Sequence, residues 1–231
     1  MSPGTLSRIA RRTLARVGSR LPAGAVHGLR VATGYVAIGH WVQQHGYGNA
    51  PRVGSRNAVF DSMLALVADE PVAYLEFGVF EGASLRYWSQ RLHHPDAELH
   101  GFDSFRGLPA SFDAAHPMGL FDLDGQPPTV DDPRVSFHVG SFEDTIPEFE
   151  VPRDKRLVIT LDADLYSSTA LVLATLDPHI IEGTLIYFDD LSRIDHEPAA
   201  FDDYLTRSGK RFTPLAFEAS FNTGSFICRG A

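Results

Sequence analysis

The sequence predicts an α/β domain with a doubly wound, mostly parallel sheet of seven strands, and three observations lead to this prediction. Short apolar runs with strand character alternate with segments of helical periodicity from residue 57 onward. The run at 72–77 is apolar at nearly every position, as in a strand that a parallel sheet buries on both faces. Three of the five strands in the alternating part end in an aspartate, which indicates a functional edge of the sheet.

Five parallel strands are predicted at 72–77, 98–103, 134–139, 157–162 and 184–189. Ser167 or Ser168 is expected to cap a helix between the last two of them, as a right-handed crossover requires. Residues 198–205 predict a further helix. The runs at 211–218 and 220–228 follow each other closely and predict an antiparallel strand pair at the end of the sheet.

The N-terminal part predicts two helices. Residues 5–21 form a basic amphipathic pattern, and residues 22–44 predict a second helix that covers the domain. Three interpretations of the first helix stay open: a membrane-surface helix, an organelle transit peptide, or an arm packed on a partner subunit. We favour the packed arm, because the basic stretch continues without a region that resembles a cleavage site. Residues 46–54 predict a loop, and Asn57 is expected to cap the next helix.

Charge is distributed unevenly along the chain. Eight of its 20 basic residues lie in residues 1–60, which contain none of its 29 acidic residues, so this part carries +8 and the remainder −17. We therefore predict a basic helical arm at 1–56 and a main domain at 57–231. The opposite charges favour a fit of arm to body, either within one chain or between subunits, and we expect a homodimer or higher homo-oligomer. The net charge of −9 argues against a general nucleic-acid-binding protein.

Two further features concern the location of the chain. Its one cysteine, Cys228, excludes an internal disulfide and fits a reducing cytoplasm. No uninterrupted apolar run reaches about 18 residues, which argues against a transmembrane segment. The sequence thus predicts a cytoplasmic protein.

The stretch YLEFGVFEGAS at 74–84 predicts a buried strand, a glycine turn and the start of a helix. Glu76 lies near the carboxyl end of the strand. Gly78 and Gly82 remove side chains where the backbone must turn and a ligand must approach, and Ser84 is a possible helix cap. Open α/β sheets bind ligands at this kind of position. The spacing of the two glycines differs from the G-x-G-x-x-G of dinucleotide-binding folds, which weakens the prediction of an NAD-dependent or nucleotide-sugar enzyme.

Asp103 ends the second strand, where an acidic residue can accept both hydrogen bonds of a ribose diol. This position predicts a ribose-containing cofactor. A helix cap or a solvated loop acid is the alternative interpretation.

A second group of acids follows the fourth and fifth strands. If these strands are neighbours, roughly 4.8 Å apart, then Asp162, Asp164, Asp189 and Asp190 converge on one small region. Four carboxylates there would repel one another unless a cation neutralised them. Oxygen ligands favour Mg²⁺, Mn²⁺ or Ca²⁺ over zinc or copper. The alternative is that the acids point apart as caps and solvated side chains.

Five motifs taken together resemble a known family. They are YLEFGVFEGAS, FDSFRGLP at 102–109, VGSFEDTIP at 139–147, LDADLYSST at 161–169 and FDD at 188–190. In this order they resemble the class I S-adenosylmethionine-dependent O-methyltransferases of the macrocin O-methyltransferase type. The resemblance implies a Rossmann-like methyltransferase fold, S-adenosylmethionine and Mg²⁺ (or Mn²⁺) as cofactors, and a sugar or another polyol or glycoside as the small-molecule acceptor.

The resemblance also implies roles for individual residues. It places Glu76, Gly78, Gly82 and Ser84 around the methionine part of the cofactor, with Asp103 and Ser104 at the ribose and Gly140, Ser141 and Phe142 at the adenine. It makes Asp162, Asp189 and Asp190 the metal ligands, with Asp162 also beside the cofactor, and it makes Asp164 the general base. The sequence departs from the family in having DAD where DGD is usual and in the residues directly after FDD, a difference that concerns the acceptor pocket.

Residues 104–130 predict a long loop, and its aromatic residues Phe105, Phe112 and Phe121 suggest a lid over the acceptor. A disordered insertion is the alternative. His116 in this loop could assist acid–base chemistry. Two further functions stay open: methyl transfer to a catechol-like diol, and a non-catalytic S-adenosylmethionine-binding protein.

Overall fold

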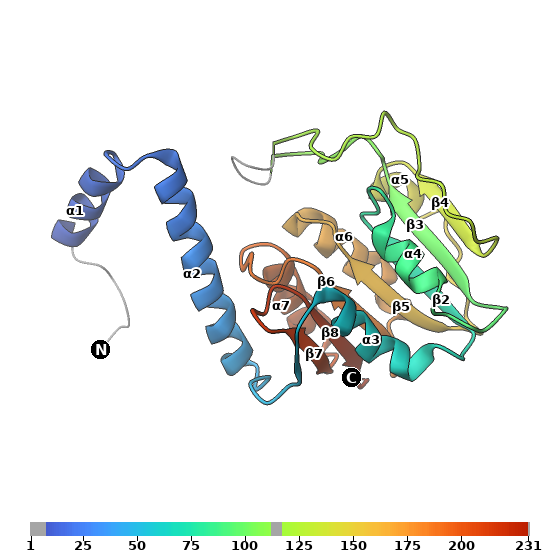
Figure 1. Ribbon diagram of the computed structural model, residues 1–231. Helices are drawn as coiled ribbons and strands as arrows, with labels where there is room; N and C mark the ends of the chain where they lie inside the picture. Colours follow the sequence, from blue (N-terminus) through green and yellow to red (C-terminus); the bar gives the residue numbers. More distant parts are fainter. Residues whose placement is uncertain (1–7, 112–116, 231) are drawn as a thin grey trace.

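The computed structural model describes residues 8–111 and 117–230, and these residues build an eight-stranded sheet between two layers of helices (Figure 1). The strands are β1 (Arg52–Val53), β2 (Val72–Phe77), β3 (Glu98–Asp103), β4 (Val135–Val139), β5 (Arg156–Leu161), β6 (Leu185–Phe188), β7 (Phe212–Glu218) and β8 (Gly224–Cys228). Their order across the sheet is β1-β7-β8-β6-β5-β2-β3-β4. Neighbouring strands are parallel, except that β8 runs antiparallel to β6 and β7.

The predicted doubly wound class and its antiparallel C-terminal pair are confirmed, with one additional strand. The two residues of β1 lie in the segment predicted as a loop and pair with Phe217 and Glu218 of β7. Two residues are too few to show an alternating pattern, so no sequence signal announces this strand. β1 precedes residue 56, so the sheet begins within the predicted arm; the domain boundary itself stays a prediction.

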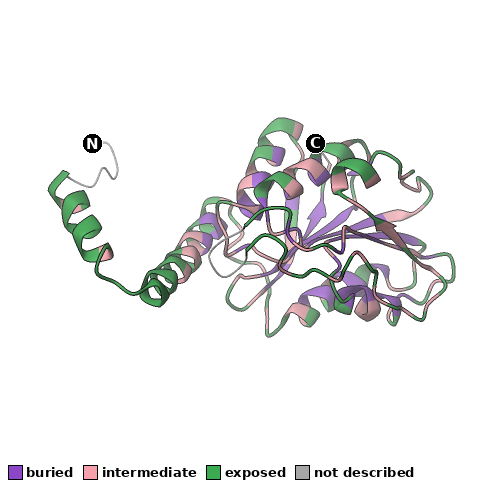
Figure 2. Ribbon diagram, turned by 90° about the horizontal axis from the view of Figure 1, so that it is seen from above, coloured by how far each residue is buried: buried purple, intermediate pink, exposed green. Residues whose placement is uncertain are grey.

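The two faces of the sheet carry separate cores. Helices α3 (Arg56–Val67) and α4 (Ala83–Ser89) cover one face. Helices α5 (Phe142–Thr145), α6 (Tyr166–Leu176) and α7 (Glu197–Ser208) cover the other, with a 3₁₀ turn at Asp177–His179 after α6. Figure 2 shows the buried strands between helices on both sides. Strand β2 is buried throughout. Its Leu75 and Phe77 pack in the α5–α7 core, whereas Tyr74 packs in the α3–α4 core, as the two-residue period of a strand requires.

The predicted caps of α3 and α6 are wrong. Ser55, not Asn57, caps α3, because its side chain accepts a hydrogen bond from the backbone N–H of Ala58. Helix α6 begins one residue before Ser167, with Leu165 at the N-cap position and no side-chain cap. Serine is common at caps, but the tertiary structure selects which nearby residue takes the position.

The N-terminal helices α1 (Arg8–Gly18) and α2 (Ala23–Gln44) project from the domain (Figure 1). No residue of α1 is buried, and α2 buries only Ile38, Trp41 and Val42 near its C-terminal end. The Trp41 indole donates to the Asp202 carboxylate of α7 at 2.9 and 3.0 Å. The predicted second helix therefore exists, but only its last turns cover the domain. None of the helices in the described ranges has the length and hydropathy needed to cross a membrane.

Candidate active site

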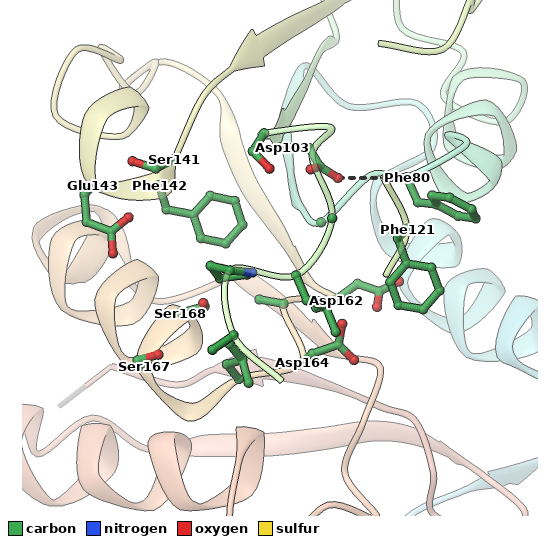
Figure 3. A pocket seen from close by; sticks show the side chains of 18 of the residues that line it. Phe80, Asp103, Phe121, Ser141, Phe142, Glu143, Asp162, Asp164, Ser167 and Ser168 are labelled. Carbon is green, nitrogen blue, oxygen red and sulfur yellow. Dashed lines mark hydrogen bonds between the residues drawn. The ribbon is translucent and has the colours of Figure 1, made fainter. Parts of the chain in front are cut away.

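The acidic residues that the sequence singled out gather at the carboxyl edge of the sheet. Strands β5 and β6 are hydrogen-bonded neighbours with Leu161 opposite Phe188, so Asp162 and Asp189, the next residue of each strand, lie side by side. Asp164 and Asp190 follow directly. This arrangement confirms the predicted convergence of the four aspartates, and all four line one cavity of about 530 Å³. Figure 3 shows two of them, Asp162 and Asp164, in this cavity.

Most of the predicted site residues line this cavity. They are Gly78, Asp103, Ser104, Gly140, Ser141, Phe142, Asp162, Asp164, Asp189 and Asp190. Three others do not: Glu76, Gly82 and Ser84. Phe80, Leu108 and Glu143 also line the cavity, although no sequence pattern predicted them there. Their side chains carry no signal that distinguishes a cavity wall from any other loop or helix start.

The backbone of Asp162 fills the space beside Gly78. The sequence had predicted that a ligand would approach at this glycine. Its φ is +89°, and a Cβ at this position would lie 1.9 Å from the backbone oxygen of Asp162. The backbone N–H of Asp162 in turn donates to the Phe77 carbonyl at 2.9 Å. The glycine thus allows the ends of β2 and β5 to approach closely, which sets the position of Asp162 in the cavity.

Gly82 and Ser84 lie at the start of α4 and not in the cavity. Gly82 is the N-cap residue with φ of +73°, and Ser84 is buried inside the first turn, so the predicted role of Ser84 as the cap is wrong. Any contact of these two residues with a cofactor stays a prediction.

Glu76 is buried beneath the cavity on the face covered by α3 and α4. The Tyr74 hydroxyl donates to its carboxylate at 2.7 Å. Burial raises the pKa of Glu76 to about 8, although Tyr74 and Arg56 act in the opposite direction. The side chain is therefore an acid whose charged form the fold disfavours near neutral pH.

This raised pKa predicts a pH-dependent stability. Between pH 4.5 and about 8 the folded chain holds a proton on Glu76 that the unfolded chain has released, so stability falls as the pH rises through this window. The wild type should lose unfolding free energy between pH 5.5 and pH 8.5. We expect this loss to be smaller in Glu76→Gln by about 2–4 kcal/mol, because glutamine does not titrate. Urea unfolding at both pH values measures this, with Glu148→Gln on the surface as control. Parallel stability profiles for Glu76→Gln and the wild type would contradict the prediction.

Asp103 is held rigidly at the end of β3. Its Oδ2 accepts hydrogen bonds from the backbone N–H groups of Val79 and Phe80 at 2.8 and 2.9 Å, and its Oδ1 accepts one from Phe105 at 2.8 Å (Figure 3). A carboxylate oxygen has further acceptor capacity. The side chain thus lies in the cavity wall in a defined orientation and with the chemistry that a ribose diol requires; the contact itself stays a prediction.

Arg56 supplies positive charge to the aspartate cluster. Its Nη2 donates to Asp162 Oδ2 at 2.8 Å, and its Nε lies 2.9 Å from Asp189 Oδ1 in an ion pair without hydrogen-bond geometry. Burial and the charge of Asp189 still raise the pKa of Asp162 well above its usual range. Burial, Asp189 and Asp164 raise the pKa of Asp190 to about 8. Even with Arg56 in place, burial and mutual repulsion therefore disfavour the charged forms of Asp162 and Asp190.

Glu197 adds a further buried carboxyl that no sequence pattern predicted. It is the first residue of α7, and its Oε2 accepts a hydrogen bond from the backbone N–H of Asp190 at 2.9 Å. Its Oε1 has no hydrogen-bond partner among the described residues. Burial and the charge of Asp190 raise the pKa of Glu197. A glutamate in the first turn of a helix is common, so its position in sequence gave no sign of this role.

The predicted metal ligands fit a divalent cation by their chemistry. Carboxylate oxygens are the ligands that Mg²⁺ and Mn²⁺ prefer. A bound cation would favour the charged forms of Asp162 and Asp190, which burial and the neighbouring acids disfavour. Within the described parts of the chain, no three His, Cys, Asp or Glu side chains are arranged around one point as a metal site. Arg56 instead contacts the oxygens of Asp162 and Asp189.

A second cavity, of about 590 Å³, adjoins the first at Asp190, which lines both. Its walls come from α2 and from the segment between β6 and α7, and they include Arg30, Thr33, Tyr35, Arg193 and His196. The N-terminal arm thus contributes to the surroundings of the aspartate cluster.

Backbone contacts join the two described segments of the long loop after β3. The backbone N–H of Leu108 donates to the Leu120 carbonyl at 2.9 Å, and Arg106 forms a bridge with Asp122. Phe105 is buried against Phe137, so it anchors the loop and does not cover the cavity. Phe121 lines the cavity and packs against Phe80, with ring centres 5.1 Å apart. Phe112 and His116 lie outside the described residues.

The sheet order and the acid-lined cavity define a doubly wound α/β domain with a candidate ligand site at the carboxyl edge of its sheet. The chain belongs to the methyltransferase-domain family, whose model matches residues 75–191, just over half of the chain. This match confirms the S-adenosylmethionine-dependent class that the five motifs predicted.

Comparisons with individual proteins agree with this family. The chain is 40% identical over 78 residues to the 8-demethyl-8-(2,3-dimethoxy-α-L-rhamnosyl)-tetracenomycin-C 4′-O-methyltransferase of Streptomyces olivaceus. The match spans 34% of this chain and 29% of that relative. The solved structure of the O-methyltransferase NovP is similar with a TM-score of 0.58 and 18% identity, and covers 91% of this chain and 100% of its own. The solved structure of the calicheamicin methyltransferase CalS11 is similar with a TM-score of 0.54 and 17% identity, and the match covers 97% of this chain and 94% of CalS11. At these identities the two structures show the fold alone.

Proposed function

We propose that this chain transfers the methyl group of S-adenosylmethionine to a hydroxyl of a sugar or sugar-containing natural product, with Mg²⁺ or Mn²⁺ as a second cofactor. The observation that carries the proposal is the convergence of Asp162, Asp164, Asp189 and Asp190 on the cavity that Asp103 also lines. The name of the Streptomyces olivaceus relative describes methylation of a sugar hydroxyl, which supports the same acceptor class here.

We assign each part of the donor to a different group of residues in the cavity wall. Asp103, fixed by three backbone N–H groups, would accept the ribose hydroxyls, and Gly140, Ser141 and Phe142 would border the adenine. The aspartates that line the cavity, when ionised, would attract the positively charged sulfonium. These contacts would direct the methyl group toward the aspartate cluster.

Asp164 is our candidate for the general base. A sugar hydroxyl has a pKa far above neutrality, so an aspartate alone cannot remove its proton efficiently. A divalent ion held by Asp162, Asp189 and Asp190 would supply Lewis acidity that lowers this pKa. As the hydroxyl oxygen forms its bond to the methyl carbon and the carbon–sulfur bond breaks, Asp164 would take the hydroxyl proton. The products would be the methyl ether and S-adenosylhomocysteine.

The second cavity is the proposed location of the rest of the acceptor. It meets the catalytic cavity at Asp190, so a hydroxyl near Asp164 can belong to a molecule that extends toward α2. Polar groups such as Thr33 and Tyr35 in its wall suit a hydroxylated ligand.

The proposed function is tested by titration and product analysis on chelator-stripped protein. We expect S-adenosylmethionine to bind with roughly micromolar affinity, and methylated rhamnosides to form only after Mg²⁺ or Mn²⁺ is added. Excess chelator should lower the rate on the order of 10³-fold. Equal rates with and without chelator would remove the metal from the proposal. Methylation of catechols but not sugars would replace the acceptor class, and absence of cofactor binding would refute the function.

The arm is proposed to pack on a second copy of the chain. Ile9 and Leu14 of α1 are 78% and 56% exposed, and the +8 charge of residues 1–60 complements the −17 of the remainder. We expect light scattering to give the mass of a dimer or higher oligomer. A truncated chain that begins at residue 22 should then dissociate, and a single-chain mass for the full-length protein would contradict the proposal.

A further inference from the structure

Arg56 reaches the aspartate cluster from the start of α3. Ser55 caps this helix, so the arginine is its first residue and its side chain extends along the carboxyl edge of the sheet. The guanidinium contacts Asp162 Oδ2 through Nη2 at 2.8 Å and Asp189 Oδ1 through Nε at 2.9 Å. It therefore bridges the acids that follow two neighbouring strands, 106 and 133 residues further along the chain.

The surroundings of Arg56 favour its charge at this position. Burial works against the charged form, but Asp189 and Asp162 outweigh it and raise the pKa of Arg56. The ring centres of Phe60 and Tyr187 lie 5.5 and 6.0 Å from the guanidinium carbon, within the range of cation–π attraction. The arginine is thus the cation that the fold itself brings to Asp162 and Asp189.

The same two carboxylates belong to the proposed metal site. Mg²⁺ binds carboxylate oxygens at about 2.0–2.1 Å, so an ion on Asp162 and Asp189 would lie within about 5 Å of a guanidinium that kept its contacts. Two like charges at this distance repel strongly in a partly buried site. One cation of the pair has to leave.

The Arg56 side chain has a direct path to solvent. Its side chain is 36% exposed, whereas the side chain of Asp189 is 19% exposed. The Nε contact to Asp189 lacks hydrogen-bond geometry, so departure from the cluster breaks one hydrogen bond, to Asp162, and one ion pair, to Asp189. A rotation of the long, flexible side chain toward solvent is therefore sufficient.

We propose that Arg56 is an exchangeable counter-ion of the aspartate cluster, which holds Asp162 and Asp189 in the metal-free chain and is displaced from them when a divalent cation binds. This inference rests on the proposed function, because it takes the cation to be the one that activates the acceptor. It makes the metal-free and metal-bound states two alternative ways to neutralise the same carboxylates.

The test measures Mn²⁺ binding to chelator-stripped protein. The electron paramagnetic resonance signal of free Mn²⁺ reports how much of the ion remains unbound. We expect Arg56→Met to bind Mn²⁺ at least about tenfold more tightly than the wild type, because the ion no longer competes with an internal cation. Arg193→Met is the matched control: it also removes one positive charge near Asp190 and should tighten binding less. Arg56→Met should also have a lower melting temperature without metal and gain more from Mn²⁺ than the wild type.

Three results would overturn the inference. The first is that Arg56→Met binds Mn²⁺ no more tightly than the wild type, and the second is that its gain in Mn²⁺ affinity does not exceed that of Arg193→Met. The third is a crystal structure with bound Mn²⁺ in which Arg56 keeps its contact with Asp162. If Arg56→Met does not fold, Arg56→Lys replaces it, with affinity expected above the wild type because lysine lacks the guanidinium fork. Absence of Mn²⁺ binding in every variant would refute the metal part of the proposed function, and the exchange with it; S-adenosylmethionine binding in the same samples tests the remainder.

Discussion

Asp164→Asn is expected to lower the rate of methyl transfer about 10³-fold, within the 10²–10⁴ range for loss of a general base, while S-adenosylmethionine binds as in the wild type. Asparagine has the same shape but cannot take the hydroxyl proton. The substitution also suits the backbone: Asp164 has a φ of +58°, a left-handed conformation that asparagine adopts more readily than most residues. The change therefore removes the base and leaves the turn after β5 in place.

Single-turnover kinetics and calorimetry on the same protein separate the two effects. Asp131→Asn, an exposed acid on the loop before β4, is the control for a change of charge and should retain wild-type rates. Mn²⁺ binding needs to be measured as well, because Asp164 lies beside Asp190 and influences its pKa. Unchanged product formation would remove Asp164 from the mechanism, and loss of cofactor binding would assign it to the donor site.

Gly78→Ala is expected to reduce the free energy of unfolding by about 3–5 kcal/mol, as the sum of a left-handed backbone cost and a steric overlap. The overlap arises because the added Cβ would lie 1.9 Å from the backbone oxygen of Asp162. Backbone atoms of two central, buried strands cannot move apart without breaking the packing around them. The same displacement would shift Asp162 in the cavity, so cofactor binding should weaken together with stability.

Gly46→Ala provides the matched control. Gly46 has a similar φ of +71°, but no atom lies within 4 Å of the position of an added Cβ. Its substitution should cost only the backbone part, about 1–2 kcal/mol. Urea unfolding of both variants isolates the steric part as their difference. Equal costs for the two substitutions would show that the close approach of Gly78 to Asp162 does not limit stability.

Local patterns in the chain were enough to establish the alternation of strands and helices and the residues at the carboxyl edge of the sheet. The apolar run of β2 and the aspartates that end β3 or follow β5 and β6 are each visible within a few residues. The convergence of Asp162 and Asp189 also followed, because strands that alternate with single helices are commonly neighbours in a parallel sheet. The S-adenosylmethionine-dependent class rested on the five motifs in order.

Contacts between distant segments account for the features that no local pattern predicted. Arg56 appeared in the sequence only as one basic residue of the arm, and nothing local indicates that it bridges Asp162 and Asp189. The close approach of Gly78 to the backbone oxygen of Asp162 follows from the register of β2 against β5, which only the structure shows. Glu197 reached the cluster only through the position of α7. Each of these depends on how elements pack in three dimensions, and packing is set by the whole core and not by the pattern of any one segment.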